Sequence, residues 1–232
     1  MSNELFNTRR ARAIIESVKQ QYSNANTICP GFLRQDIVLA AGQTSYKFSL
    51  QGDQNQQNPP QQLLLRNDNF IVMEMGFFIY HANSAATPAT FPANAVLQTY
   101  PNARIFAANL ERASLNAIYN GTWQLKVDQA VPVNGASMMV YKRVPIRQQS
   151  AADVALLPAA ATENELALDG EYAGNFGLVA TEPLITLKGN KNVELTVNIP
   201  NYAAFNPAPA AGSNYLVAFA TGLLVAGVNQ GS

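Results

Sequence analysis

The sequence predicts an all-β protein, a single antiparallel β-sandwich preceded by an N-terminal amphipathic helical arm. From Gln35 onward, apolar and polar residues alternate with a period of two, which is typical of strands with one buried face. Turn residues recur at intervals of about ten, and no helical patterns alternate with the strands. About ten strands suit one sandwich or barrel, whereas two stacked eight-stranded units would need about sixteen.

The arm, residues 1–28, has a helical pattern. Its apolar residues fall on one face at 100° per residue: Ala11, Ile14, Ile15, Val18 and Tyr22. Charged residues fall on an adjacent face: Arg9, Arg12, Glu16 and Lys19. Because an isolated helix of this length is marginal in water, we expect the apolar face to dock on another subunit. Cys29, Pro30 and Gly31 predict a hinge-like junction at the start of the main domain, residues 29–232.

The strand pattern is clearest at Val193, Leu195, Val197 and Ile199, and it recurs over residues 46–50 and 123–127. Two longer apolar runs, residues 70–80 and 215–225, predict central strands covered on both faces, or strands at an interface.

A hairpin is predicted at Asn120-Gly121, between strands over residues 114–119 and 122–128. A type I′ turn needs positive φ at both central residues, which Asn and Gly tolerate. Ile118 would then lie opposite Trp123. Asn120-Gly121-Thr122 also matches a glycosylation sequon, but no secretory signal is expected, so we prefer the hairpin.

Long loops are expected at residues 51–62, 82–95, 150–175 and 200–213. Residues 150–187 hold six acids and no base, a local charge of −6, whereas residues 1–34 hold five bases and two acids, a charge of +3. Opposite patches on identical subunits predict a heterologous contact. The candidate residues of the acidic loop are Glu163, Glu165, Asp169 and Glu171.

Several kinds of chemistry are disfavoured by the composition. The single histidine, His81, and the single cysteine, Cys29, cannot build a zinc site of Cys and His ligands, and no phosphate-binding glycine loop or nucleophile elbow occurs. The acidic loop matches no calcium-loop pattern, so solvated charge is the simpler interpretation. We expect no cofactor, no small-molecule substrate and no enzymatic activity.

No secretory signal or membrane span is expected. The N-terminal segment is interrupted by bases, and the most apolar run, residues 215–228, is short for a span.

Four features together resemble bacteriophage virion proteins of the jelly-roll, capsid type. They are the arm over residues 3–22, the segment Ala117-Ile118-Tyr119-Asn120-Gly121 before an alternating strand, the exit at 141–149 and the terminal apolar strand at 215–228. The resemblance covers most of the chain, although members with two jelly rolls are longer. It implies a jelly-roll-like sandwich used as a building block, tied to its neighbours by arm and loops. It also implies a location in the virion after assembly in the host cytoplasm.

These observations predict a virion structural protein, a capsid-shell subunit whose partners are its own copies and other virion proteins. A decoration protein or tail component stays open. The expected interface residues of the arm are Arg9, Arg10, Arg12, Ile14, Ile15, Val18 and Tyr22. Four bases would give a salt slope of about −3.6 at best, so genome contact by the arm would be weak. The alternative is a carbohydrate- or host-attachment module that uses Tyr100, Tyr172 and Tyr202 as loop aromatics.

Overall fold

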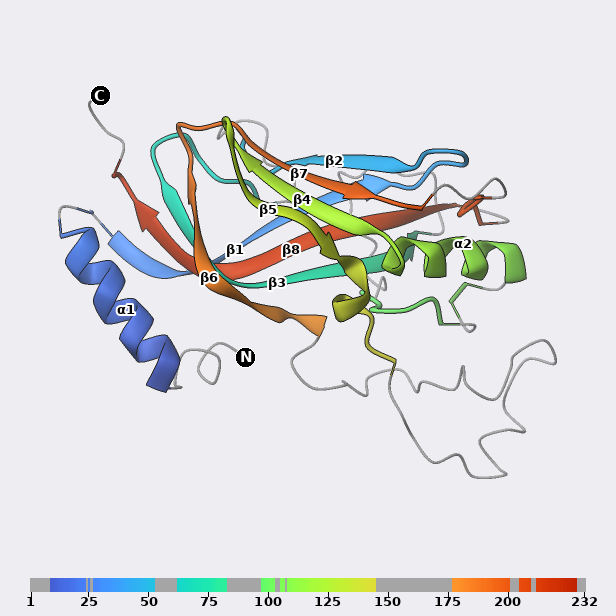
Figure 1. The fold of residues 1–232 in the computed structure, drawn as a ribbon, viewed down its shortest axis with the longest axis horizontal. Coiled ribbons are helices and arrows are strands. Elements are labelled where there is room, and N and C mark those ends of the chain that lie inside the picture. Colours follow the sequence, from blue (N-terminus) through green and yellow to red (C-terminus); the bar gives the residue numbers. More distant parts are fainter. Residues whose placement is uncertain are drawn as a thin grey trace.

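The protein is a sandwich of two four-stranded antiparallel sheets with helix α1 (Arg9–Gln21) at one end (Figure 1). This computed structural model confirms the predicted β-sandwich with a short N-terminal helix. It describes residues 9–23, 25, 27–52, 62–82, 97–102, 105–106, 108–144, 177–200, 205–209 and 212–228, with only the backbone at 9 and 10. Most of the four expected long loops therefore lies outside the described residues.

The strands are distributed between the sheets as in a jelly roll. The first sheet contains, in order, β1 (Thr27–Val38), β8 (Ser213–Ala226), β3 (Asn69–Ala82) and β6 (Val179–Lys188). The second contains β2 (Ser45–Ser49), β7 (Val193–Asn198), β4 (Thr122–Val127) and β5 (Ala130–Ser137). The chain crosses between the sheets at each connection except β4 to β5, which is the wrapping of an eight-stranded jelly roll.

The inner faces of the two sheets form the core, as the alternation predicts. Tyr46 and Phe48 of β2 are fully buried, and so are Val193, Leu195 and Val197 of β7. β3 and β8 are the inner strands of the first sheet and are buried on both faces, which confirms the expectation for residues 70–80 and 215–225. A register shift in β3 between Val72 and Glu74 lets both Phe70 and Phe77 point into the core.

The predicted hairpin at Asn120-Gly121 is wrong. Residues 114–119 belong to helix α2 (Asn109–Tyr119), which buries Leu115, Ile118 and Tyr119 at helical spacing. Asn120 ends this helix with φ −88° and ψ 0°, so there is no type I′ turn. Glycine is needed at position 121 for another reason: a Cβ there would lie 2.3 Å from the carbonyl oxygen of Asn198. Six apolar-rich residues are too few for periodicity to separate helix from strand.

The chain instead reverses between β4 and β5 at Asp128 and Gln129, where Asp128 has φ 52°. Gly135, with φ 70°, lies inside β5 at a break in register with β4. The second Asn-Gly pair of the sequence thus marks a β-bulge.

The expected hinge at Cys29, Pro30 and Gly31 is also wrong. These residues lie in β1, opposite Leu224, Leu223 and Gly222 of β8. β1 is the edge strand of its sheet, where a proline is tolerated because one side of the strand needs no ladder hydrogen bond. Strand β1 therefore begins at Thr27, two residues before Cys29.

Candidate assembly surface

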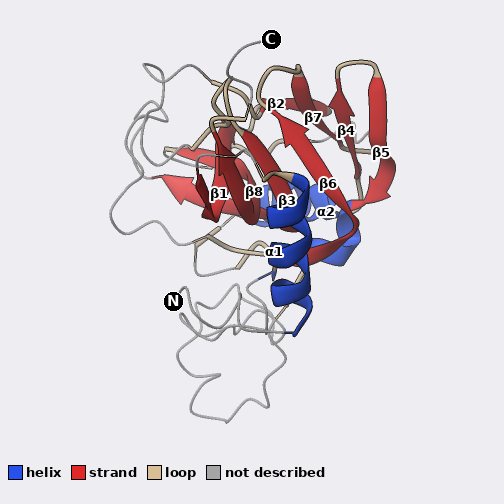
Figure 2. Ribbon diagram, turned by 90° about the vertical axis from the view of Figure 1, so that its left-hand side faces the viewer, coloured by secondary structure: helices blue, strands red, loops and turns tan. Residues whose placement is uncertain are grey.

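Helix α1 packs on the outer face of the first sheet of its own chain (Figure 2). Ala11 and Val18 are 1% and 3% exposed, and Ile14, Ile15 and Tyr22 are partly buried. They contact the outer side chains at one end of β3 and β8, namely Ile71, Met73, Leu223 and Val225. We expected this apolar face to need another subunit. In the single chain, its own sheet offers this face a docking site. Contact of the arm with another subunit stays a prediction.

The remaining interface residues predicted for the arm are polar. Arg12 is exposed, and the side chains of Arg9 and Arg10 lie outside the described residues. The acidic loop, with Glu163, Glu165, Asp169 and Glu171, also lies outside them. Contact between arm and acidic loop therefore stays a prediction.

The aromatic residues proposed to bind sugars differ in whether the structure describes them and in how exposed they are. Tyr100 is 6% exposed, so it does not present its ring to solvent. Tyr172 and Tyr202 lie outside the described residues. Phe32 of β1, which the sequence analysis missed, is 45% exposed and stacks on Phe219 with ring centroids 5.5 Å apart. Phe32 precedes Gln35, where the period-two pattern begins, so the alternation did not assign its side chain to a face of β1.

Cys29 and His81 are too far apart to act together. Cys29 lies opposite Leu224 and His81 opposite Asn214, ten positions apart on β8. At about 3.3 Å per residue this is a separation of about 33 Å. A thiolate–imidazole pair is therefore excluded.

A buried polar network ties α2 to β8. The side-chain amide of Asn214 donates to Glu111 Oε1 at 2.5 Å and to the carbonyl oxygen of Pro207 at 2.7 Å. Glu111 Oε2 accepts from the backbone N–H of Ala108 at 3.3 Å, and Asn214 Oδ1 lies 2.9 Å from His81 Nδ1. Both Glu111 and Asn214 are buried, and their polar atoms are used within the chain. The network thus holds the fold together.

No metal site or membrane helix emerges from the described ranges. Within them, no three His, Cys, Asp or Glu side chains gather where they could hold a metal ion. The helices described there are too short or too polar to cross a membrane.

The β1 edge of the sandwich is covered by the chain itself. Arg34 donates its backbone N–H to the carbonyl oxygen of Gln62 at 2.8 Å, and Gln62 donates back to that of Arg34 at 3.0 Å. Two residues on, the N–H of Leu64 donates to the carbonyl oxygen of Leu50, just past β2. Leu64 is 1% exposed and belongs to the core. Residues 62–64 therefore bridge the edges of both sheets.

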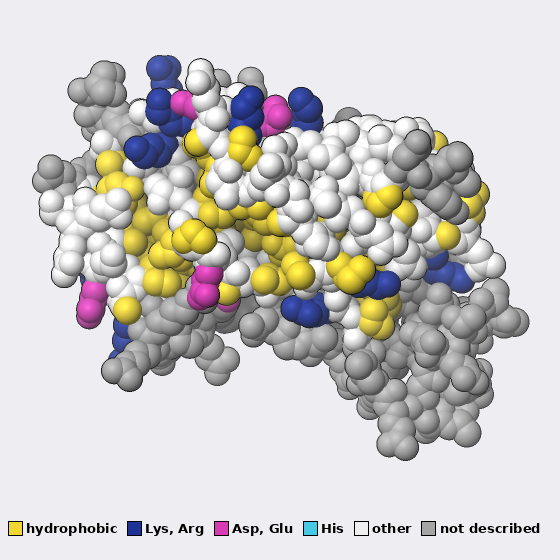
Figure 3. All heavy atoms as spheres, viewed as in Figure 1, with side chains coloured by type: hydrophobic (Ala, Val, Ile, Leu, Met, Phe, Trp, Pro, Cys, Tyr) yellow, Lys and Arg dark blue, Asp and Glu magenta, His cyan; other side chains and the backbone are white. Residues whose placement is uncertain are grey.

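The opposite side, where β5 and β6 are the outermost strands, is open. It faces the viewer in Figure 1 and lies at the right in Figure 2. Within the described ranges, no backbone pairs with the outer side of β5 or of β6. Figure 3 shows hydrophobic side chains gathered along this side of the molecule. Of the eight large hydrophobic side chains exposed in the described residues, five lie here, and we call them the open-edge surface: Val131, Met139, Val140, Val144 and Leu184.

The 3-10 helix η2 (Met138–Tyr141) holds part of this surface in place. Met138 and Tyr141 are buried, and the Tyr141 ring packs edge-on against Phe77 at a centroid distance of 4.9 Å. Between these two anchors, Met139 and Val140 are 61% and 47% exposed. A short, doubly anchored helix thus presents two apolar side chains to solvent.

The sequence carries a signal for this surface that the strand pattern does not include. Residues 129–141, which include all of β5 and η2, contain no charged residue. Charge is the usual protection of an exposed edge strand, so a stretch of this length without it is informative. It went unnoticed because periodicity does not show which strands lie at an edge.

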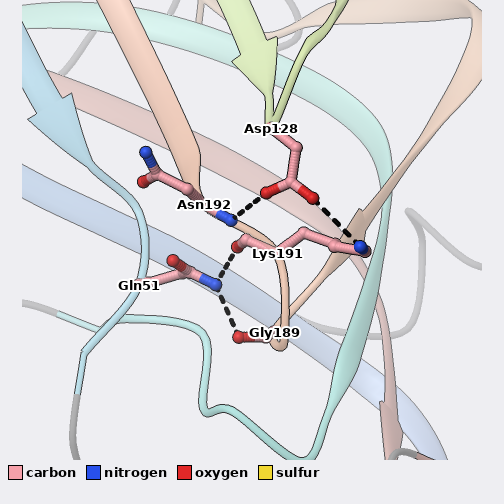
Figure 4. Close-up of polar contacts among 5 residues, drawn as sticks. All are labelled: Gln51, Asp128, Gly189, Lys191 and Asn192. Carbon is pink, nitrogen blue, oxygen red and sulfur yellow. Dashed lines mark hydrogen bonds and ion pairs between the residues drawn. The ribbon is translucent and has the colours of Figure 1, made fainter.

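One end of the open edge is tied by polar contacts between two turns (Figure 4). Asp128 follows β4, and its carboxylate accepts from the backbone N–H of Asn192 at 2.7 Å and pairs with Lys191 Nζ at 3.0 Å. These contacts, the one with Lys191 first, lower the pKa of Asp128. The side-chain amide of Gln51 donates to the carbonyl oxygens of Gly189 and Lys191. The cluster joins the β4–β5 turn to the β6–β7 turn.

Comparison with known proteins identifies no relative of this chain. No protein-family model, curated protein or solved structure matches the chain. The strand order and the surfaces are thus what bear on function.

Proposed function

We propose that this protein is a virion structural protein, a capsid-shell subunit that works by self-assembly and not by catalysis. Jelly rolls serve as viral capsid proteins, lectins and cupins, so the fold alone does not choose among these functions. The observation that carries the proposal is the open-edge surface. An apolar, largely uncharged strip along two outermost strands is typical of a surface that another protein covers.

The partners in this proposal are other copies of the chain and further virion proteins, and the location is the virion. The composition supports assembly through neutral contacts, because only 13% of residues are charged. Packing uncharged surfaces avoids the cost of removing charges from water. Genome contact by the arm has modest support, since Arg12 and Lys19 are exposed on α1.

A carbohydrate- or host-attachment module is the second candidate function, and one observation favours it. Phe32, exposed and stacked on Phe219, offers a flat aromatic face on β1. Aromatic rings of this kind bind apolar sugar faces. Binding of the isolated chain to a glycan array, lost in Phe32→Ala, would support this module over a shell subunit.

The test of the shell proposal is assembly of the purified full chain. We expect sedimentation velocity to show association as protein concentration rises, and electron cryo-microscopy to show capsomers or shells. A chain that stays monomeric throughout would contradict the proposal. Glycan binding by that monomer would then point to the second function.

A further inference from the structure

We propose that the outer face of the first sheet carries a binding site for neutral sugars, made by Phe32 of β1, Thr221 of β8 and Glu74 of β3. This inference rests on the carbohydrate-binding candidate for the function. It names the class of sugar and the polar residues that bind it beside Phe32. It does not depend on whether the chain also forms shells.

The three residues form one row across three neighbouring strands, which lie side by side in Figure 2. Phe32 and Glu74 are both register partners of Thr221, which lies between them. Adjacent strands are about 4.8 Å apart, so the Cα atoms of Phe32 and Glu74 are separated by about 10 Å. The Thr221 hydroxyl donates to Glu74 Oε2 at 3.3 Å, and Phe32 stacks on Phe219, two residues from Thr221 on β8. The three side chains therefore share one face of the sheet.

The aromatic side of the site is held in place by other rings. The Phe219 ring lies nearly parallel to that of Phe32, at an interplanar angle of 14°. Phe219 in turn packs edge-on against Phe78, with ring centroids 6.3 Å apart. Phe78 is buried, whereas Phe32 is 45% exposed. The Phe32 ring is thus anchored before a ligand arrives, and the apolar face of a sugar can pack on it with little further loss of freedom.

The polar side of the site is a carboxylate with an unused oxygen. Glu74 is partly exposed, and in the described part of the chain its carboxylate has one hydrogen bond, from Thr221 to Oε2, and no ion pair. Its Oε1 atom is not enclosed by the protein, so this oxygen can accept from a ligand. Carboxylates accept strong hydrogen bonds from hydroxyl groups.

Two acceptors side by side favour a sugar over an organic cation. The Thr221 hydroxyl has given its hydrogen to Glu74, so the lone pairs of Thr221 Oγ1 are left to accept. Adjacent hydroxyls of a sugar ring can then donate to Glu74 Oε1 and Thr221 Oγ1 while an apolar face of the ring lies on Phe32. A cation without hydroxyls would use the carboxylate and the aromatic ring but not Thr221.

The charge of the site selects against acidic sugars. Asp36, further along β1, is neutralised by Arg34, whose guanidinium donates to both carboxylate oxygens at 2.9 and 2.8 Å. Glu74 has no such partner among the described residues, so the site is negative where the hydroxyls bind. The carboxylate of a sialic or uronic acid would be repelled there.

The experiment screens the full chain on an array of neutral and acidic glycans. We expect binding to neutral glycans and none to sialylated or uronic-acid glycans. Phe32→Ala and Glu74→Ala should each weaken binding to the neutral glycans at least tenfold, because each removes one side of the site. Glu74→Gln keeps the shape and an acceptor but removes the charge, so we expect this variant to accept acidic glycans as well. A role of Glu74 in folding alone would not change this preference.

Val38→Ala and Glu194→Ala are the matched controls. Val38 is an exposed residue six positions along β1 from Phe32, and Glu194 lies on the outer face of the second sheet, where it pairs with Lys47. We expect both to bind glycans like the wild type. Thermal melts of all variants identify any that fail to fold.

The outcomes separate this site from the function on which it rests. A wild type that binds no glycan would refute the carbohydrate-binding candidate itself. A wild type that binds glycans with an affinity unchanged in Phe32→Ala or Glu74→Ala would keep that candidate and overturn this site. A preference for acidic glycans, or binding of tetramethylammonium in place of neutral glycans, would also overturn it.

Discussion

The two edges of the first sheet, β1 and β6, differ in what lies against them. Residues 62–64 pair with the β1 edge and place Leu64, 1% exposed, in the core. No described backbone pairs with the outer side of β6, where Leu184 is 38% exposed. Both edges have apolar residues, so composition alone does not identify an interface. What separates them is whether the chain returns to cover its own edge.

The outer face of the same sheet supports this distinction. Its apolar end at Ile71 and Leu223 is covered by α1, and it is therefore no longer available to a partner. The open-edge surface has no such cover among the described residues. We therefore expect substitutions on the covered side to change stability, and substitutions on the open edge to change association.

The largest expected effect on stability is the difference between the same substitution at Leu64 and at Leu184. Leu64→Ala should lower the free energy of unfolding by about 2 to 5 kcal/mol, because it leaves a cavity in the core. Leu184→Ala, the same change on the open edge, should cost about 0.5 kcal/mol or less. Denaturant unfolding of the two variants and the wild type measures both. Equal losses would remove the distinction between the edges.

The next effect concerns the face that α1 covers. Val18→Asp should lower the free energy of unfolding by about 2 to 3 kcal/mol, because it places a carboxylate against Ile71 and Leu223. Ser17→Asp changes the exposed neighbour and serves as the control. Deleting residues 1–24 should also destabilise the sandwich. A deletion variant that melts like the wild type but assembles more weakly would instead show that the arm links subunits.

Two glycines give a third test. A Cβ at Gly189 would lie 1.9 Å from the carbonyl oxygen of Leu65, next to the segment that covers the β1 edge. Gly189→Ala should therefore cost about 1 to 3 kcal/mol. Gly135, on β5, has no atom within 4 Å of its Cβ position, so Gly135→Ala should cost only the strain of φ 70°, about 1 kcal/mol or less. Thermal melts that reverse this order would contradict the packing of the β6–β7 turn against Leu65.

The smallest effect is a pH dependence at the end of the open edge. Asp128 has its pKa lowered in the folded protein by Lys191 and the Asn192 N–H. Its contribution to stability is therefore present above its ordinary pKa of 3.8 and is lost as pH falls through the lower folded value. The melting-temperature difference between wild type and Asp128→Asn should be constant near neutral pH and should shrink below about pH 4. A difference that persists unchanged into acid would show that the charge of Asp128 is unimportant.

Strand prediction succeeded where one face of a strand is buried. In such a strand, apolar residues on the buried face alternate along the sequence with polar residues on the exposed face. β2, β4 and β7 follow it closely. It failed at residues 114–119, where Leu115, Ile118 and Tyr119 fit helical spacing as well as a short strand. It failed at Pro30 because a proline ends a central strand but not an edge strand, and position in the sheet is not visible in the chain.

The sequence by itself determined the sandwich, its two central strands and the amphipathic arm, because these depend on local periodicity and on the length of apolar runs. Only the tertiary structure decided what each apolar surface touches. The face of Ala11 and Val18 must be buried in any case, but the choice between its own sheet and another subunit depends on where β3 and β8 end. Likewise, only the tertiary structure shows that residues 62–64 return to the β1 edge, whereas the outer sides of β5 and β6 have no described backbone partner. Such contacts join residues far apart in the sequence, and no local pattern encodes them.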